Sequence, residues 1–255
     1  MIRIGGLDTY YTLDGQGEPV VLLHGWGTSS QSLAGVAASL RETFRVLSLD
    51  LPGFGWSQAP PAAWGMEEYT THVLTLLDQA DISRAAFVGH SFGGRIAISL
   101  AARRPERVSR LALVASAGVR PPRGARYRLR VTVTKLLARL AALPGFGRLG
   151  EQFLSRWRER VGSRDYRAAG RMRPTLVKVV NEDQTPMLPL VRASTLLLWG
   201  DQDLEVSRHA MEVMAARIPR ARLVVFPGAG HFPFQDAPEP FLRHLTGFLR
   251  GEDRE

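Results

Sequence analysis

The chain has 255 residues, of which 45% are hydrophobic and 22% charged, proportions typical of a globular protein that buries a core. It contains no cysteine, which excludes disulfide bonds and thiolate metal sites. No apolar run approaches the roughly 20 residues needed to cross a bilayer. The first residues also lack the apolar core of a signal peptide. We therefore expect a cytoplasmic protein without stable membrane insertion, either a monomer or a weak homodimer.

The net charge of +9 is concentrated in one segment of the chain. Between residues 120 and 173, 14 arginines and one lysine stand against three acidic residues, which gives +12 and leaves the remainder slightly acidic. Because the segment carries no recognisable nucleic-acid motif, we expect no nucleic-acid partner. Three interpretations stay open: a compositional bias toward arginine, a basic vestibule that attracts anionic substrates, and an affinity for anionic membrane surfaces.

In chain order, short apolar runs alternate with helical patterns, which indicates a parallel sheet with crossover helices. The first half of the chain predicts strands at 20–23, 44–50, 85–88 and 108–115, and helices at 31–41, 65–80 and 93–104. The last part predicts strands at 194–199 and 221–226, and helices at 207–216 and 240–250.

The pattern changes between residues 119 and 190. Two apolar stripes at helical spacing occur here, one at Leu129, Val133, Leu136, Leu137, Leu140 and Leu143, the other at Phe153, Trp157 and Val161. Arginines fill the faces between them. We therefore predict a core made of residues 1–118 and 191–255, interrupted by a helical insertion at 119–190.

Residues 86–95 read AFVGHSFGGR, a short apolar run followed by a serine among glycines. Gly89 and Gly93 flank Ser91 in the pattern G-x-S-x-G, and the predicted strand–turn–helix context makes that pattern informative. A nucleophilic serine also needs a base, a group that orients the base, and donors for an oxyanion. Taken alone, the stretch favours a nucleophile, with a glycine-rich turn whose serine caps a helix as the alternative.

Two later turns offer the missing partners. The stretch LLLWGDQD presents Asp201 and Asp203 after one predicted strand, and VVFPGAGHFPF presents His231 after the next. In open α/β sheets, ligands bind at the carboxyl ends of the strands. We therefore expect Ser91, His231 and one of the two aspartates to meet at that edge.

The chain resembles the α/β-hydrolase fold superfamily over essentially its whole length. VVLLHGWG is similar to the oxyanion loop of that family, VGHSFGGR to its nucleophile elbow, and LLLWGDQD and GAGHFPF to its acid and histidine turns. The order Ser, Asp, His also matches. The resemblance implies a mostly parallel sheet of about eight strands flanked by helices, with a helical lid inserted after the sixth strand.

The resemblance further implies a catalytic triad of Ser91, His231 and Asp203, because the family acid is usually the third residue after the glycine of the WG turn. It assigns the oxyanion hole to the backbone N–H groups of Trp26 and Phe92. His24 is expected to shape the oxyanion loop rather than to catalyse. We expect no cofactor and no metal, because the sequence has neither metal-ligand spacing nor a nucleotide-binding glycine motif.

The expected reaction is hydrolysis of a small carboxylic ester, with the lid selecting the substrate and with an anionic ester as a hypothesis. A serine nucleophile argues against the relatives that use an aspartate, such as those acting on haloalkanes and epoxides. Two alternatives use the same triad: cleavage of a C–C bond in a ring-cleavage product, and thioester hydrolysis. A third alternative, from a different class, is a ligand receptor with very slow turnover.

Overall fold

The computed structural model describes residues 1–120, 132–134, 137, 139 and 164–252. Of the first predicted stripe, only Val133 and Leu137 are described, both in helical conformation. The second stripe, Phe153, Trp157 and Val161, lies outside the described residues. Within residues 119–190 the structure therefore describes mainly the return segment, residues 164–190.

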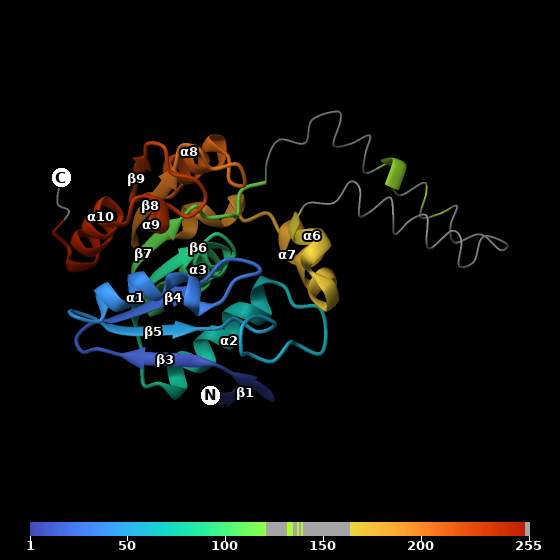
Figure 1. The fold of residues 1–255 in the computed structure, drawn as a ribbon, viewed down its shortest axis with the longest axis horizontal. Coiled ribbons are helices and arrows are strands. Elements are labelled where there is room, and N and C mark those ends of the chain that lie inside the picture. The colour runs from blue at the N-terminus through green and yellow to red at the C-terminus, as the bar shows by residue number, and fades with distance from the viewer. Residues whose placement is uncertain (121–131, 135–136, 138, 140–163, 253–255) are drawn as a thin grey trace.

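A seven-stranded sheet forms the centre of the fold (Figure 1). Its spatial order is β3 (Tyr11–Asp14), β5 (Arg45–Leu49), β4 (Pro19–Leu23), β6 (Ala85–His90), β7 (Val108–Val114), β8 (Ser194–Gly200) and β9 (Ala221–Phe226). The edge strand β3 pairs antiparallel with β5, and every other neighbouring pair is parallel. The carboxyl ends of the six parallel strands therefore meet along one edge of the sheet, as predicted.

The central strands are apolar on both faces because helices cover both. In β4, Val20 and Leu22 belong to one hydrophobic core, whereas Val21 and Leu23 belong to another. This alternation follows from the period of two in a strand, and near-continuous apolar runs are typical of parallel sheets buried on both sides.

Each face has its own helices (Figure 1). On one face lie α1 (Ala34–Leu40), preceded by the 3-10 turn η1 (Ser30–Leu33), and α10 (Pro238–Arg250). On the other lie α2 (Met66–Gln79), α3 (Phe92–Arg103) and α8 (Arg208–Arg217). Shorter elements are η2 (Pro105–Arg107), α6 (Arg164–Ala168), η3 (Gly170–Met172), α7 (Arg173–Asn181), η4 (Thr185–Leu190) and α9 (Pro233–Asp236).

The N-terminal strands were not predicted. The strands β1 (Ile2–Ile4) and β2 (Leu7–Thr9) form a separate antiparallel pair, and β3 joins the main sheet at its edge. The main sheet therefore has seven strands among the described residues where about eight were expected. The predicted insertion follows β7, the fifth main-sheet strand along the chain rather than the sixth, because β1 and β2 pair only with each other.

Hydrogen bonds join the entry and the return segment of the predicted insertion to each other and to α3. The Gln184 N–H donates to the carbonyl of Gly118 at 3.0 Å, and the Gln184 amide Nε2 donates to the carbonyl of Arg95 at 2.8 Å. Arg95, buried in the first turns of α3, donates from Nη1 to the carbonyl of Glu182 at 2.9 Å. Together these bonds attach the entry and the return of residues 119–190 to α3.

Within the described ranges, no helix is both long and apolar enough to cross a membrane.

Candidate active site

Ser91 lies on a tight turn between β6, which ends at His90, and α3, which begins at Phe92. Its backbone has φ 49° and ψ −106°, a conformation that is strained for any residue with a Cβ. The Ser91 N–H donates to the carbonyl of Val114 at 3.0 Å, and the Ser91 carbonyl accepts from the N–H of Ala117 at 3.2 Å. These bonds to the end of β7 hold the strained turn, which leaves Ser91 partly exposed at the carboxyl edge of the sheet.

Glycine is required next to Ser91 because α3 packs directly on the backbone of β4. A Cβ placed on Gly93 would collide with the carbonyl oxygen of Leu23. A Cβ on Gly25 would lie 2.8 Å from Nδ1 of His90. The absence of side chains at these two positions lets the loop after β4 approach the Ser91 turn.

His231 and Asp203 form a hydrogen-bonded pair at the ends of neighbouring strands. Nδ1 of His231 lies 2.9 Å from Oδ2 of Asp203, and both side chains are at least nine-tenths buried. The other carboxylate oxygen of Asp203 accepts the N–H groups of Glu205 at 2.8 Å and Val206 at 2.9 Å. Burial raises the pKa of the Asp203 carboxyl, but the hydrogen bonds from His231 and from these two N–H groups outweigh it and lower the pKa below its ordinary value. Asp203 is therefore a fixed carboxylate at neutral pH.

Asp201, the other aspartate of the turn, has a different set of partners. Its Oδ1 accepts the N–H of Gly228 at 2.8 Å and the side-chain amide of Gln202 at 3.2 Å. Asp201 thus joins the loops that follow β8 and β9, while the hydrogen bond to His231 is made by Asp203.

His90 connects the Ser91 turn to the His231 loop. Its Nε2 donates to the backbone carbonyl of His231 at 2.9 Å, and the two imidazole centroids lie 4.8 Å apart. Burial, together with the nearby His231 ring, lowers the pKa of His90 to about 3. His90 therefore stays neutral and holds the His231 backbone beside the residue that precedes Ser91.

Of the two predicted oxyanion residues, Trp26 lies in the loop after β4 and Phe92 at the start of α3. The His24 ring donates from Nδ1 to the carbonyl of Gly25 at 2.8 Å and accepts the Leu51 N–H at Nε2 at 2.9 Å. Burial lowers the pKa of His24 to about 4, consistent with this neutral tautomer. The Trp26 ring packs edge-on to the Phe92 ring, with centroids 5.3 Å apart. The Phe92 N–H belongs to the first turn of α3, where amides have no acceptor within the helix.

Glu205 was not predicted as a site residue. Its Oε2 lies 3.2 Å from Nε2 of His231, the imidazole nitrogen opposite the one that contacts Asp203. The Glu205 side chain is 57% exposed, whereas that of His231 is only 9% exposed. No motif marks this glutamate, because its approach to His231 depends on how the loop after β8 folds back.

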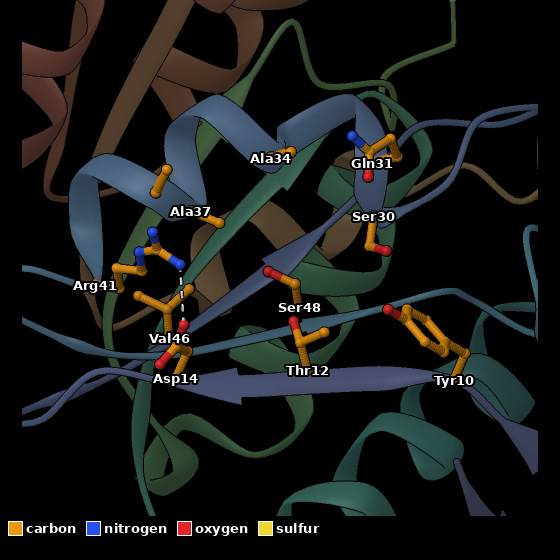
Figure 2. Close-up of a pocket in the computed structure, with 11 residues that line it drawn as sticks. Tyr10, Thr12, Asp14, Ser30, Gln31, Ala34, Ala37, Arg41, Val46 and Ser48 are labelled. Atoms are coloured by element: carbon orange, nitrogen blue, oxygen red, sulfur yellow. Dashed lines mark hydrogen bonds and ion pairs between the residues drawn. The ribbon is translucent and has the colours of Figure 1, made fainter.

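A separate hollow of about 230 Å³ lies between α1, the edge strand β3 and its neighbour β5. Figure 2 shows hydroxyl groups from both strands facing it, with the Arg41–Asp14 ion pair of 3.1 Å at one end. Apart from that pair its lining residues are uncharged: Tyr10, Thr12, Ser30, Gln31, Ala34, Ala37, Ala38, Val46 and Ser48. None of the sequence-predicted site residues contributes to it.

Comparison with known proteins identifies the family and supports the fold. Residues 18–238 match the model of a family described as alpha/beta hydrolase fold. A 2-hydroxymuconate semialdehyde hydrolase from Pseudomonas putida is 31% identical, over 99% of this chain and 94% of that protein. A pimeloyl-[acyl-carrier protein] methyl ester esterase from Nitrosomonas europaea is also 31% identical, over 89% of this chain and 94% of that protein. Among solved structures, an enol-lactonase from Burkholderia xenovorans LB400 superposes with a TM-score of 0.74 at 27% identity, covering 97% of this chain and 98% of that one.

Proposed function

This chain belongs to the alpha/beta hydrolase fold family, and from that membership we propose that it is a serine hydrolase cleaving a small carboxylic ester. The observation that carries the proposal is the His231–Asp203 hydrogen bond, which lies beside the strained Ser91 turn at one edge of the sheet. The similar proteins include a semialdehyde hydrolase, a methyl ester esterase and an enol-lactonase. These names support hydrolysis as the reaction class.

In the first half of the proposed reaction, the Ser91 Oγ attacks the ester carbonyl carbon while Nε2 of His231 takes the hydroxyl proton. The N–H groups of Trp26 and Phe92 donate hydrogen bonds to the carbonyl oxygen and stabilise the negative charge that develops on it. Collapse of the tetrahedral intermediate breaks the C–O bond, and the alkoxide leaves with the proton carried by His231. Asp203 fixes the tautomer of His231 and stabilises the imidazolium that forms.

In the second half, water attacks the acyl-enzyme and gives one proton to His231. The second tetrahedral intermediate then expels Ser91, which recovers the proton, and the carboxylic acid is released. The two halves use the same groups, so the cycle needs no redox partner and no further reactant besides water.

The test is labelling of Ser91 with a fluorophosphonate and, in a separate unlabelled sample, turnover of short p-nitrophenyl esters. We expect labelling and multiple turnover in the native protein and neither in Ser91→Ala. Labelling without multiple turnover would favour the receptor with very slow turnover, and absence of labelling in a folded protein would overturn the serine-hydrolase proposal.

Cleavage of a C–C bond is the second candidate, because a 2-hydroxymuconate semialdehyde hydrolase is as similar to this chain as the methyl ester esterase. The same Ser91 and His231 would serve this reaction and thioester hydrolysis. A direct comparison of kcat/KM on p-nitrophenyl, thioester and vinylogous diketone substrates separates them. The substrate with the highest ratio identifies the reaction, and Ser91→Ala controls for background hydrolysis.

The substrate-selecting part of this proposal concerns residues 119–190, which we propose form a lid over the core made of residues 1–118 and 191–255. The arginines of the segment would favour esters that carry a remote carboxylate or phosphate. The expected result is a higher kcat/KM for anionic than for matched neutral esters, with an advantage that falls as ionic strength rises. Equal rates without salt dependence would leave the arginines as a compositional bias.

A further inference from the structure

Two carboxylates from one loop contact the two nitrogens of His231. Asp203 lies 2.9 Å from Nδ1, and Glu205 lies 3.2 Å from Nε2. The proposed reaction assigns Nε2 to the proton of Ser91, so Glu205 occupies the position at which His231 has to act. The Glu205 carboxylate is mostly exposed, and its side chain is therefore free to change rotamer, whereas His231 is fixed by burial and by the Asp203 bond.

The two carboxylates determine which protonation state of the His231 imidazole is favourable. A neutral imidazole carries one N–H, and the low-pKa carboxylate of Asp203 claims it at Nδ1. Nε2 then offers a lone pair, which does not bond to the oxygen of a second carboxylate. With Glu205 ionised, the 3.2 Å contact is favourable only when Nε2 also carries a proton, that is, when His231 is an imidazolium hydrogen-bonded to Asp203 and paired in charge with Glu205.

We propose that Glu205 is a positioning residue that stabilises a resting imidazolium form of His231, from which Nε2 must be released before it can activate Ser91. This inference rests on the proposed function. The charged or titratable groups that face His231 within the described part of the chain are Asp203 and Glu205 of the loop after β8, and His90 at the end of β6. His90 is neutral, so the two carboxylates set the charge around the ring.

The direct test is an NMR titration of the His231 ring nitrogens in the Ser91→Ala protein, with and without Glu205→Gln. Glutamine keeps the size of the side chain and the backbone N–H that Glu205 donates to Asp203, and removes only the charge. We expect the titration midpoint of His231 to move to lower pH by roughly 0.5 unit or more, the scale of a partly exposed charge pair. The matched control is Glu212→Gln on α8, whose exposed carboxylate pairs with Arg208 at 2.9 Å.

The kinetic experiment uses proteins that retain Ser91, with an ester that the parent protein hydrolyses. For Glu205→Gln we expect the acidic limb of the kcat/KM profile to move to lower pH by the same amount, with the plateau value at least equal to that of the parent. A His231 midpoint and an acidic limb that match those of Glu212→Gln would overturn the proposal. The NMR arm requires no turnover, so a shifted midpoint in a protein that hydrolyses nothing would count against the proposed function and in favour of the Glu205 contact.

Discussion

His231 and Asp203 are 28 residues apart in the chain, yet Nδ1 of the first lies 2.9 Å from Oδ2 of the second. The pairing follows from the sheet, because Asp203 comes after β8 and His231 after β9, and these strands are parallel neighbours. Two loops that leave adjacent strands in the same direction place their first residues side by side. The bond therefore depends on strand register, and it fixes the imidazole in one orientation.

Asp203→Asn should abolish most of the activity, because an amide at this position favours the wrong tautomer of His231. By analogy with other serine triads, we expect kcat to fall roughly 10³- to 10⁴-fold with little change in thermal stability. The measurement is kcat on a p-nitrophenyl ester. Asp201→Asn is the matched control, since Asp201 contacts Gly228 and Gln202 instead of His231, and it should lose less than about tenfold. The reverse ranking would identify Asp201 as the acid.

Ser91→Gly should be more stable than the parent, although inactive. Glycine tolerates φ 49° without strain, and strain of this kind costs about 1–3 kcal/mol. Part of that gain is offset by the extra freedom of glycine in the unfolded chain, about 0.5–1 kcal/mol. We expect a net gain of about 1 kcal/mol in urea unfolding, whereas Ser91→Ala, which keeps the Cβ and its strain, should stay near the parent. Equal stabilities of the two variants would show that the turn is not strained.

Arg95→Met should destabilise the protein by about 1–3 kcal/mol, the cost of leaving a half-buried carbonyl without its charged donor. The carbonyl is that of Glu182, which Arg95 contacts at 2.9 Å. Arg103→Met on the same helix is the control, because the 3.7 Å contact of Arg103 with Glu67 is exposed and its loss should change stability by less than about 0.5 kcal/mol. Urea unfolding of both variants tests this, and similar losses would contradict a specific role for Arg95.

Acidification from pH 6.5 to 4.5 should destabilise the fold through its buried histidines. Burial lowers the pKa of His72 to about 4, below the ordinary value near 6.5 that it regains on unfolding. Between these values the unfolded chain binds more protons than the folded one, so stability is lost as pH falls, by at most about 1.4 kcal/mol per pH unit for one histidine. His24 and His90 act in the same direction.

His72→Gln isolates one of these contributions. Its Nε2 lies 3.0 Å from Oγ1 of Thr9, a bond that a glutamine amide can reproduce, and it lies outside the proposed catalytic machinery. The variant should show a shallower loss of unfolding free energy over this pH window, with esterase activity at pH 7.5 unchanged. A slope identical to that of the parent would mean that His72 does not titrate as its burial requires.

The sequence alone predicted the parallel strands and the helices that cover them, because their apolar runs are long and their periods clear. It did not predict β3, whose YTLD sequence alternates half-buried and exposed residues at the sheet edge and has no apolar run. The separate pairing of β1 with β2 was equally invisible, since three-residue strands carry almost no periodic signal.

For the candidate site, the resemblance to the α/β-hydrolase family favoured Asp203 over Asp201, and it is Asp203 that contacts His231. The role of Ser91 and the oxyanion donors Trp26 and Phe92 stay predictions. The contact of Glu205 with His231 could not be inferred from the sequence. An exposed glutamate in a loop is ordinary, and only tertiary structure brings it to Nε2 of His231. The contact of His90 with the His231 backbone is likewise a product of packing between two loops.

The hydrogen bond between Gln184 and Gly118 closes the point at which the insertion leaves and re-enters the fold. Because both ends are fixed at one place, the length and composition of everything between them are uncoupled from the register of β7 and β8. The entropy cost of closing a loop grows only slowly with its length, so replacing this segment by one of another length should change the stability of the core little. Under the proposed lid function, replacing the residues between Gly118 and Gln184 would change the substrate range while leaving the register of β7 and β8 in place.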